Sequence, residues 1–308
     1  MTQPLLLPPE DDELAIGHAL RLAKVNDLPG SNLPATLRAL VPDTVQRPAR
    51  NLPLASALAL LGGMQPGEYL QRHTAIPVLR FTTWPSEIAP HSQTTTEIVR
   101  SFAMKVPRGS GLICPDCVEA QVREKGFSWY RRRHHMFGVD WCVDHGTPLR
   151  EVSDPKPLSK LPADWLRSGK LTALPNCTGQ LENAPEFVQR LVAVSAKAYS
   201  LTEPVSDLLL KCLCSVRAKS MGLRLIYSEN KPTLSDKVLQ LAPMAWVRAH
   251  LNGLEVKTPG DYFREVDDLL FAQTHATALA ALLGLATLFE DPVDRLERLV
   301  HQDPLVFH

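Results

Sequence analysis

The sequence has no apolar stretch long enough to cross a bilayer. Its longest nearly apolar run, residues 276–289, has 14 residues, whereas a membrane-spanning helix needs ~20. A run of this length is typical of a buried helix, so no membrane span is expected. The first residues also lack the basic region of a secretory signal and turn acidic at Glu10. Both absences predict an intracellular, cytoplasmic protein.

The chain also lacks an excess of charge of either sign. Its 33 Lys and Arg residues balance 33 Asp and Glu residues, so the formal net charge is zero. The field of the whole molecule therefore cannot hold a polyanion, and any nucleic-acid surface must be local. With 44% hydrophobic and 21% charged residues, the composition excludes intrinsic disorder as the main state.

The motifs of common enzymes are missing as well. The chain has no phosphate-binding GxxxxGK[ST] loop, no HExxH zinc motif and no GxSxG nucleophile elbow. Its six cysteines are too few for a disulfide scaffold and indicate a reducing compartment, where paired cysteines suggest metal or packing. The sequence therefore predicts a protein that is not an enzyme.

The residue pattern predicts a mainly α protein in three regions. A helical region is expected over residues 1–105, a small module with paired cysteines over 106–160, and an all-α domain over 161–308. The first boundary follows residues 75–110, where frequent prolines predict irregular structure.

The first region contains a pattern like that of a helix-turn-helix. The acidic residues 10–13 come before apolar residues at helical spacing, which predicts a helix over 12–24. A leucine-rich helix over 52–61 stops at Gly62 and Gly63, and a polar helix follows over 67–74. Most such hairpins are packing units, and Arg72 and His73 are the only basic residues of the second helix. Packing and DNA recognition therefore both stay open.

The third region is expected to be helical throughout. Asn183 is a candidate N-cap for a helix in which Phe187, Leu191 and Val194 recur at helical spacing. Further helices are predicted over residues 203–219, 234–252, 260–288 and 291–301.

Two short Cys/His pairs predict one structural zinc ion in the central module. Two residues separate Cys114 from Cys117, two separate Cys142 from His145, and 24 residues lie between the pairs. This spacing lets each tight turn deliver two ligands to a tetrahedral Zn2+ at about 2.0–2.3 Å. Three thiolates and an imidazole fill the coordination shell, so a hydrolytic metal is not expected. The alternative, buried thiols without a metal, is disfavoured by the repeated spacing.

The densest cluster of positive residues lies between the two pairs. Arginine interleaved with aromatic residues such as Trp129 and Tyr130 suits phosphate contacts and base stacking. The same cations could instead pair with the acidic segment 10–13, pair with another subunit, or form a solvated face. The candidate nucleic-acid or partner-binding residues are Arg123, Lys125, Arg131, Arg132, Arg133, His134 and, in the N-terminal hairpin, Arg72.

Neighbouring histidines raise a catalytic alternative. His134 and His135 are similar to the adjacent histidines of HNH-type nucleases, which need a further Asn or His along the chain. That residue is needed about two dozen residues on, where the only candidate is His145, which is already assigned to zinc, so nuclease chemistry is not expected. The other cysteines lack ligand spacing and are predicted to be core thiols: Cys177, Cys212 and Cys214.

Together, the start of the chain and the cysteine block resemble the TniQ/TnsD family of bacterial transposon target-selection proteins. The resemblance covers about residues 8–150, whereas residues 160–308 show only a helical character. At the start it rests on the acidic-then-helical residues 10–24. In the block it rests on Cys114-Pro115-Asp116-Cys117, Trp129-Tyr130, Arg131 and His134, Gly138-Val139, and Cys142-Val143-Asp144-His145-Gly146-Thr147-Pro148-Leu149.

The resemblance implies a non-catalytic adaptor that marks a target and recruits an AAA+ ATPase regulator, which in turn loads the transposase. Some family members read attachment-site DNA directly, and others, in CRISPR-associated transposons, dock as dimers on a guide-RNA effector complex. Near-zero net charge favours the second style, because delegated recognition needs fewer phosphate contacts. The alternative is a stand-alone zinc-containing DNA-binding regulator.

Overall fold

A computed structural model describes residues 4–30, 32–42, 49–84, 87–175, 177–226, 230–270 and 276–301. The chain forms two compact units, each assembled from segments that are distant in sequence. Compactness does not show which segments fold on their own, so the predicted division into three regions stays a prediction. Unit 1 comprises Met1–Leu79, Pro90–His135 and Leu149–Leu174, and unit 2 comprises Arg80–Ala89, Met136–Pro148 and Pro175–His308.

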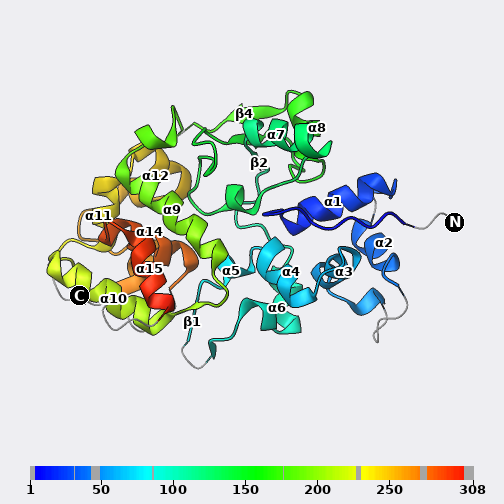
Figure 1. The fold of residues 1–308 in the computed structure, drawn as a ribbon. Coiled ribbons are helices and arrows are strands. Elements are labelled where there is room, and N and C mark those ends of the chain that lie inside the picture. Colours follow the sequence, from blue (N-terminus) through cyan, green and yellow to red (C-terminus); the bar gives the residue numbers. More distant parts are fainter. Residues whose placement is uncertain are drawn as a thin grey trace. The chain divides into compact units, whose positions relative to one another are not determined.

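Unit 1 is mainly helical and contains one small sheet (Figure 1). Strands β2 (Leu112–Ile113), β3 (Arg150–Val152) and β4 (Leu171–Ala173) form this sheet, which is antiparallel in the order β2-β3-β4. Its helices, with η for 3-10 helices, are α1 (Ala15–Val25), α2 (Leu33–Ala39), η1 (Ala49–Asn51), α3 (Leu54–Leu61), α4 (Pro66–His73), α5 (Ile76–Leu79), η3 (His91–Gln93), α6 (Thr96–Phe102), α7 (Pro115–Lys125), η4 (Arg132–His135) and α8 (Pro162–Arg167).

Unit 2 is also mainly helical, so the prediction of a mainly α protein is confirmed. In its described residues the short strands β1 (Thr82–Thr83) and β5 (Val205–Ser206) pair in parallel. Its helices are η5 (Leu181–Asn183), α9 (Glu186–Ser200), α10 (Asp207–Ser220), α11 (Leu234–Leu241), α12 (Met244–His250), η6 (Leu254–Val256), α13 (Arg264–Asp267), η7 (Asp268–Leu270), α14 (Ala278–Leu288) and α15 (Pro292–Val300).

Helix α14 is the central element of unit 2. All its residues from Ala280 to Leu288 are buried, and it packs against α9, α10, α11, α13 and α15. The long apolar run therefore forms a buried helix, as the sequence predicts. Among the described residues, no helix is both long and apolar enough to span a membrane.

Several predicted helix boundaries are wrong. The helix expected over 234–252 is divided into α11 and α12, because Pro243 cannot donate the backbone hydrogen bond that would continue α11. The helix expected over 260–288 is replaced by α13, η7 and α14, with residues 271–275 outside the described part. Asn183 lies in η5, and Pro185 occupies the N-cap position of α9.

Two predictions for less regular segments also need correction. The stretch 75–110, expected to be irregular, contains α5, α6 and the short strand β1. The helix expected over 203–219 starts only at Asp207, because the preceding residues pair with β1 as strand β5. For β1 and β5, the pairing of residues far apart in the sequence decides the local structure, and no local sequence signal reveals it.

The predicted helical hairpin is present as α3 and α4. Helix α3 ends at Gly62, Gly63 takes a left-handed φ of +70°, and Pro66 opens α4. Both helices bury apolar side chains in one core cluster with α1, α2 and α6. Glu68 and Arg72, on the exposed side of α4, form an ion pair at 2.9 Å. The geometry is that of a packed hairpin, and a role in DNA recognition stays a prediction.

The backbone of Gly138 lies close against Trp246 in unit 2. The indole Nε1–H of Trp246 donates to the carbonyl of Gly138 at 2.9 Å. Gly138 has a φ of +67°, and a Cβ there would lie 2.7 Å from the Cζ2 atom of Trp246. We expect Gly138→Ala to lower the free energy of unfolding by about 2–4 kcal/mol, from left-handed strain plus overpacking.

Chemical denaturation with urea would measure this loss. Gly126→Ala is the matched control, because Gly126 is also left-handed, with a φ of +79°, but open space surrounds its Cβ position. The control should lose only about 1–2 kcal/mol. Equal losses in the two variants would contradict the close packing of Trp246.

Candidate metal centre

The first pair of predicted ligands lies at the start of α7. Cys114, which directly follows β2, occupies the N-cap position, and Pro115 is the first residue of the helix. Cys117 therefore lies in the first turn, so both thiols gather at the helix N-terminus. Both are buried. Cysteines bind metal ions as thiolates.

The second pair is presented by a tight turn. The N–H of Cys142 donates to the carbonyl of Thr147, and the N–H of Gly146 donates to the carbonyl of Cys142, both at 2.8 Å. Gly146 has a φ of +65°, which glycine adopts without the steric cost of a Cβ. The Sγ atom of Cys142 lies 3.6 Å from Nδ1 of His145. The turn thus brings the ligand atoms of Cys142 and His145 together.

The four predicted ligands converge. The ligand atoms of Cys114, Cys117, Cys142 and His145 all lie within 4.8 Å of one another. Tetrahedral coordination at a metal–sulfur distance of about 2.3 Å separates the sulfur atoms by about 3.8 Å. One metal ion could therefore be coordinated by all four residues of the cluster. The residues form a Cys3His cluster compatible with a structural metal ion.

The acidic N-terminal segment, residues 10–13, lies against the basic stretch, residues 131–133. The N–H of Leu14 donates to the carbonyl of Tyr130, and the N–H of Arg132 donates to the carbonyl of Asp12, both at 2.8 Å. The Asp12 carboxylate forms ion pairs with Arg132 at 3.6 Å and Arg133 at 3.1 Å. The alternative that these arginines pair with the segment 10–13 is confirmed for Arg132 and Arg133.

Arg132 is buried in unit 1, where it is only 8% exposed. Its Nη1 donates to the carbonyls of Gln71 at 2.7 Å and Thr74 at 3.2 Å, at the C-terminal end of α4. A cation at this end of a helix interacts favourably with the helix dipole. The guanidinium therefore fastens the basic stretch to the hairpin.

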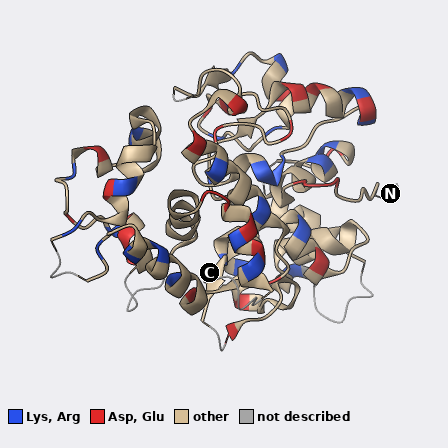
Figure 2. Cartoon of the chain, turned by 60° about the vertical axis from the view of Figure 1, so that its left-hand side comes forward, with Lys and Arg blue, Asp and Glu red and all other residues tan. Residues whose placement is uncertain are grey.

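The other candidate arginines and Lys125 lie nearer to solvent, and several have carboxylate partners. Arg123 pairs with Glu124 at 3.9 Å, and Lys125 pairs with Glu10 at 3.5 Å. Arg131 is half-buried. Figure 2 shows Lys and Arg interspersed with Asp and Glu along the chain. A binding role for these residues stays a prediction.

His134 and His135 are buried beside the metal cluster. Nε2 of His134 lies 3.8 Å from Sγ of Cys117, and Nε2 of His135 accepts the N–H of Leu112 at 3.2 Å. Burial lowers the pKa of His134 to about 4 and that of His135 to about 3, so both rings are neutral. These buried rings support the elements that carry the ligands, an arrangement that disfavours the nuclease alternative.

A buried ion pair that sequence analysis missed anchors the acidic segment. Glu13 is 0% exposed and Arg21 is 2% exposed. Nε and Nη2 of Arg21 donate to the two carboxylate oxygens of Glu13 at 2.8 and 2.6 Å. Burial raises the pKa of Glu13 even though Arg21 favours its ionised form. Glu13 lies before α1 and Arg21 lies within it, so helix periodicity does not pair them.

A buried polar network between α1 and α4 was also missed. Nδ1 of His18 lies 2.9 Å from the hydroxyl of Tyr69, and its Nε2 lies 2.8 Å from the carbonyl of Leu7. Nδ1 of His73 lies 3.1 Å from the carbonyl of Glu13. Burial lowers the pKa of His18 to about 3 and that of His73 to about 4. Both histidines sit at core positions of amphipathic helices, which is the only signal the sequence offers.

These lowered pKa values predict acid lability. Below about pH 6.5 a histidine is protonated in the unfolded chain, whereas His18 and His73 stay neutral in the folded protein. The free energy of unfolding therefore falls as the pH falls. Each histidine contributes a slope of up to about 1.4 kcal/mol per pH unit. We expect His18→Gln to reduce the pH dependence of the free energy of unfolding, measured by urea unfolding, by the contribution of about one proton. His301→Gln, at an exposed position, should leave it unchanged. A His18→Gln slope equal to that of the parent protein would contradict the burial of a neutral His18.

Comparison with known proteins finds a family match over the part of the chain that contains the cluster. The model of the TniQ family matches residues 4–149, close to the range 8–150 in which the sequence shows the resemblance. The matched residues include the acidic segment, the α3–α4 hairpin and all four ligands of the Cys3His cluster. A search of curated proteins found no significant match. The match associates this part of the chain with target selection in transposition, and we identify residues 4–149 as a TniQ domain.

Proposed function

We propose that the protein is a non-catalytic adaptor that selects target sites for a DNA transposon. It would link a target-recognition element to an AAA+ ATPase that regulates the transposase. The observation that carries this proposal is the TniQ match over residues 4–149, which contains the complete Cys3His cluster. The ion-paired basic stretch and the buried histidines suit a rigid scaffold for partners.

We further propose that the metal is a single structural Zn2+. Three thiolates and one imidazole are ligands that zinc takes in closed tetrahedral sites. Such a set leaves no open position for water, and zinc with four protein ligands supplies folding energy rather than hydrolysis. The role of Cys114, Cys117, Cys142 and His145 would then be to hold the ligand-bearing elements in one arrangement.

Recognition of the target is proposed to be delegated to a guide-RNA effector complex. The zero net charge supports this, because direct reading of DNA relies on phosphate contacts by cations. The ion pairs of Arg132 and Arg133 with Asp12 support it further. Direct reading of attachment-site DNA is the competing mode, for which Arg72, Arg123 and Lys125 are the exposed members of the candidate set.

Affinity purification of the tagged full-length chain from its host cell tests the adaptor role. We expect an AAA+ ATPase to co-purify, together with a guide-RNA effector complex if recognition is delegated. Cys142→Ser should lose these partners, and Cys212→Ser, at an exposed cysteine outside the cluster, should keep them. Purification without any ATPase would contradict the adaptor role and favour the stand-alone regulator. Light scattering on the same samples would measure whether the chain is a homodimer.

Selection of sheared genomic duplex by the purified protein, at physiological salt, separates the two recognition modes. Delegated recognition predicts that no sequence is enriched. Enrichment of one site would instead establish direct reading. In that case Arg123→Ala and Lys125→Ala should each lower the salt dependence of binding by about one ion.

A further inference from the structure

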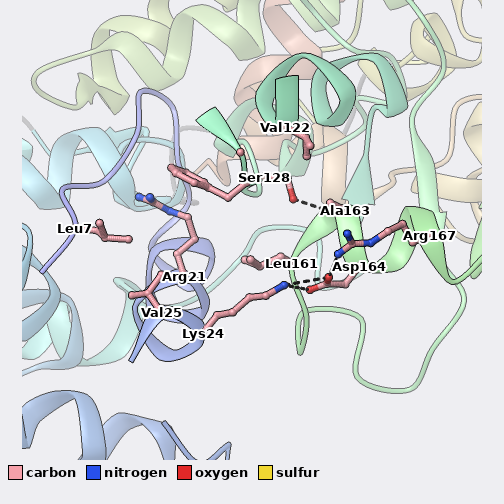
Figure 3. A pocket seen from close by; sticks show the side chains of 12 residues that line it. Leu7, Arg21, Lys24, Val25, Val122, Ser128, Leu161, Ala163, Asp164 and Arg167 are labelled. Carbon is pink, nitrogen blue, oxygen red and sulfur yellow. Dashed lines mark hydrogen bonds and ion pairs between the residues drawn. The ribbon is translucent and has the colours of Figure 1, made fainter. Parts of the chain in front are cut away.

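Unit 1 contains a pocket that none of the roles above uses. Its volume is 290 Å³, and its lining comes from the N-terminal segment, the C-terminal ends of α1 and α7, and the start of α8. The lining is mostly apolar, including Leu7, Val25, Val122, Phe127 and Leu161 (Figure 3). We call it the α1–α7–α8 pocket. Its size is at the lower end for ligand cavities, which suits one large side chain better than a cofactor.

The walls of the pocket are held in place by buried contacts. The guanidinium of Arg21 lies 4.5 Å above the ring of Phe127 and is fixed by its ion pair with Glu13. The hydroxyl of Ser128 accepts the N–H of Ala163 at 2.8 Å. An apolar side chain would therefore enter a preformed cavity, which lowers the entropic cost of binding.

Exposed apolar side chains gather at the segments that line this pocket. In the described part of unit 1, the large hydrophobic residues that are exposed are Leu5, Leu6, Val25 and Val122, at 55%, 45%, 44% and 40%. Val25 and Val122 line the pocket, and Leu5 and Leu6 precede the lining residue Leu7. Exposed apolar residues that cluster around a cavity mark an interaction site.

At the rim of the pocket, two cations pair with one carboxylate. Nζ of Lys24 lies 2.9 Å from one oxygen of Asp164, and a guanidinium nitrogen of Arg167 lies 2.5 Å from the other. Burial raises the pKa of Asp164, but the two cations outweigh it and hold the pKa below its ordinary value. Lys24 is 55% exposed and Arg167 is 73% exposed. Two cations thus share one carboxylate, which leaves room for a second carboxylate from a ligand.

We infer that the α1–α7–α8 pocket binds a short segment of a partner protein, which inserts one large apolar side chain and places a neighbouring carboxylate against Lys24 and Arg167. The mostly apolar walls favour a protein side chain over a nucleic acid, whose affinity comes mainly from contacts between its phosphates and cations. This inference does not rest on the proposed function, because it uses only the cavity, the exposed side chains and the rim charges.

A displayed library of random peptides, selected on the full-length protein, tests the inference. The enriched peptides should share a Leu, Phe or Trp beside an Asp or Glu. Their affinity should fall about tenfold or more in Val122→Asp, which puts a negative charge in the wall, and in Ala163→Phe, which fills the cavity. Val216→Asp is the matched control, an exposed helical valine on α10, and should change affinity less than about twofold. Circular dichroism confirms that each variant is folded.

Three outcomes would overturn the inference. The first is the absence of an apolar–acidic motif among the selected peptides. The second is a motif whose affinity Val122→Asp and Ala163→Phe leave unchanged. The third is a tenfold gain in affinity after deletion of residues 302–308, which contain Asp303, Leu305 and Phe307, because the chain's own end would then be the occupant. Weaker binding of a selected peptide to Lys24→Gln/Arg167→Gln, with a flatter salt dependence, would support the rim contact.

Discussion

Under the proposed zinc site, replacing Cys142 with serine is expected to release the metal ion and to unfold the segment that holds the cluster, residues 106–150. The binding free energy of a structural zinc ion is folding free energy, on the order of 10 kcal/mol in small zinc peptides. That value is comparable with the whole stability of a typical domain, about 5–15 kcal/mol. The melting temperature should therefore fall by about 10 °C or more. Because Cys142 is one of four converging ligands, three remaining ligands would not close the site.

Metal content and thermal melting of the purified variants would check this result. The parent protein should retain one zinc ion per chain, and Cys142→Ser should retain much less. Two control variants separate loss of a ligand from loss of a thiol: Cys212→Ser removes an exposed thiol and Cys214→Ser removes a buried one on α10. Both should keep full zinc. A Cys142→Ser protein that keeps stoichiometric zinc and an unchanged melting temperature would contradict the assignment of four ligands.

Glu13→Gln is expected to lower the free energy of unfolding by about 3–5 kcal/mol, because it strands the charge of Arg21 in the interior. Arg21 is 2% exposed. It would keep its hydrogen bond to the carbonyl of Pro8, at 2.8 Å, and its contact with the ring of Phe127, but its remaining ion pair, with Glu10, spans 4.0 Å. The loss should be concentrated in unit 1, because Glu13 also lies in the segment that pairs with the basic stretch. Urea unfolding at neutral pH would measure it.

Two further variants identify the cause of that loss. Glu68→Gln breaks the exposed pair with Arg72, and it should cost less than about 1 kcal/mol because solvent screens that pair. The double variant Glu13→Gln/Arg21→Met removes the stranded charge and should recover part of the stability lost in Glu13→Gln. If the double variant were less stable than Glu13→Gln alone, an uncompensated charge would not be the cause.

The arginines between the two ligand pairs illustrate where sequence analysis reached its limit. Their density predicted a binding surface, with pairing to the acidic segment as an alternative. The structure places Arg132 inside unit 1 and pairs it with Asp12, which lies well over a hundred residues earlier in the chain. Charge density along a sequence does not reveal which cations are buried, because burial depends on contacts between distant segments.

The Cys3His cluster, the mainly α character and the TniQ resemblance of residues 4–149 could be read from the sequence, because each depends on local spacing. Two ligands on one turn and apolar residues at helical intervals are properties of a few neighbouring residues. The Glu13–Arg21 pair, the partners of Arg132 and the α1–α7–α8 pocket required the tertiary structure. These features arise where segments distant in sequence meet, and the burial that sets their charge states and energies exists only after folding.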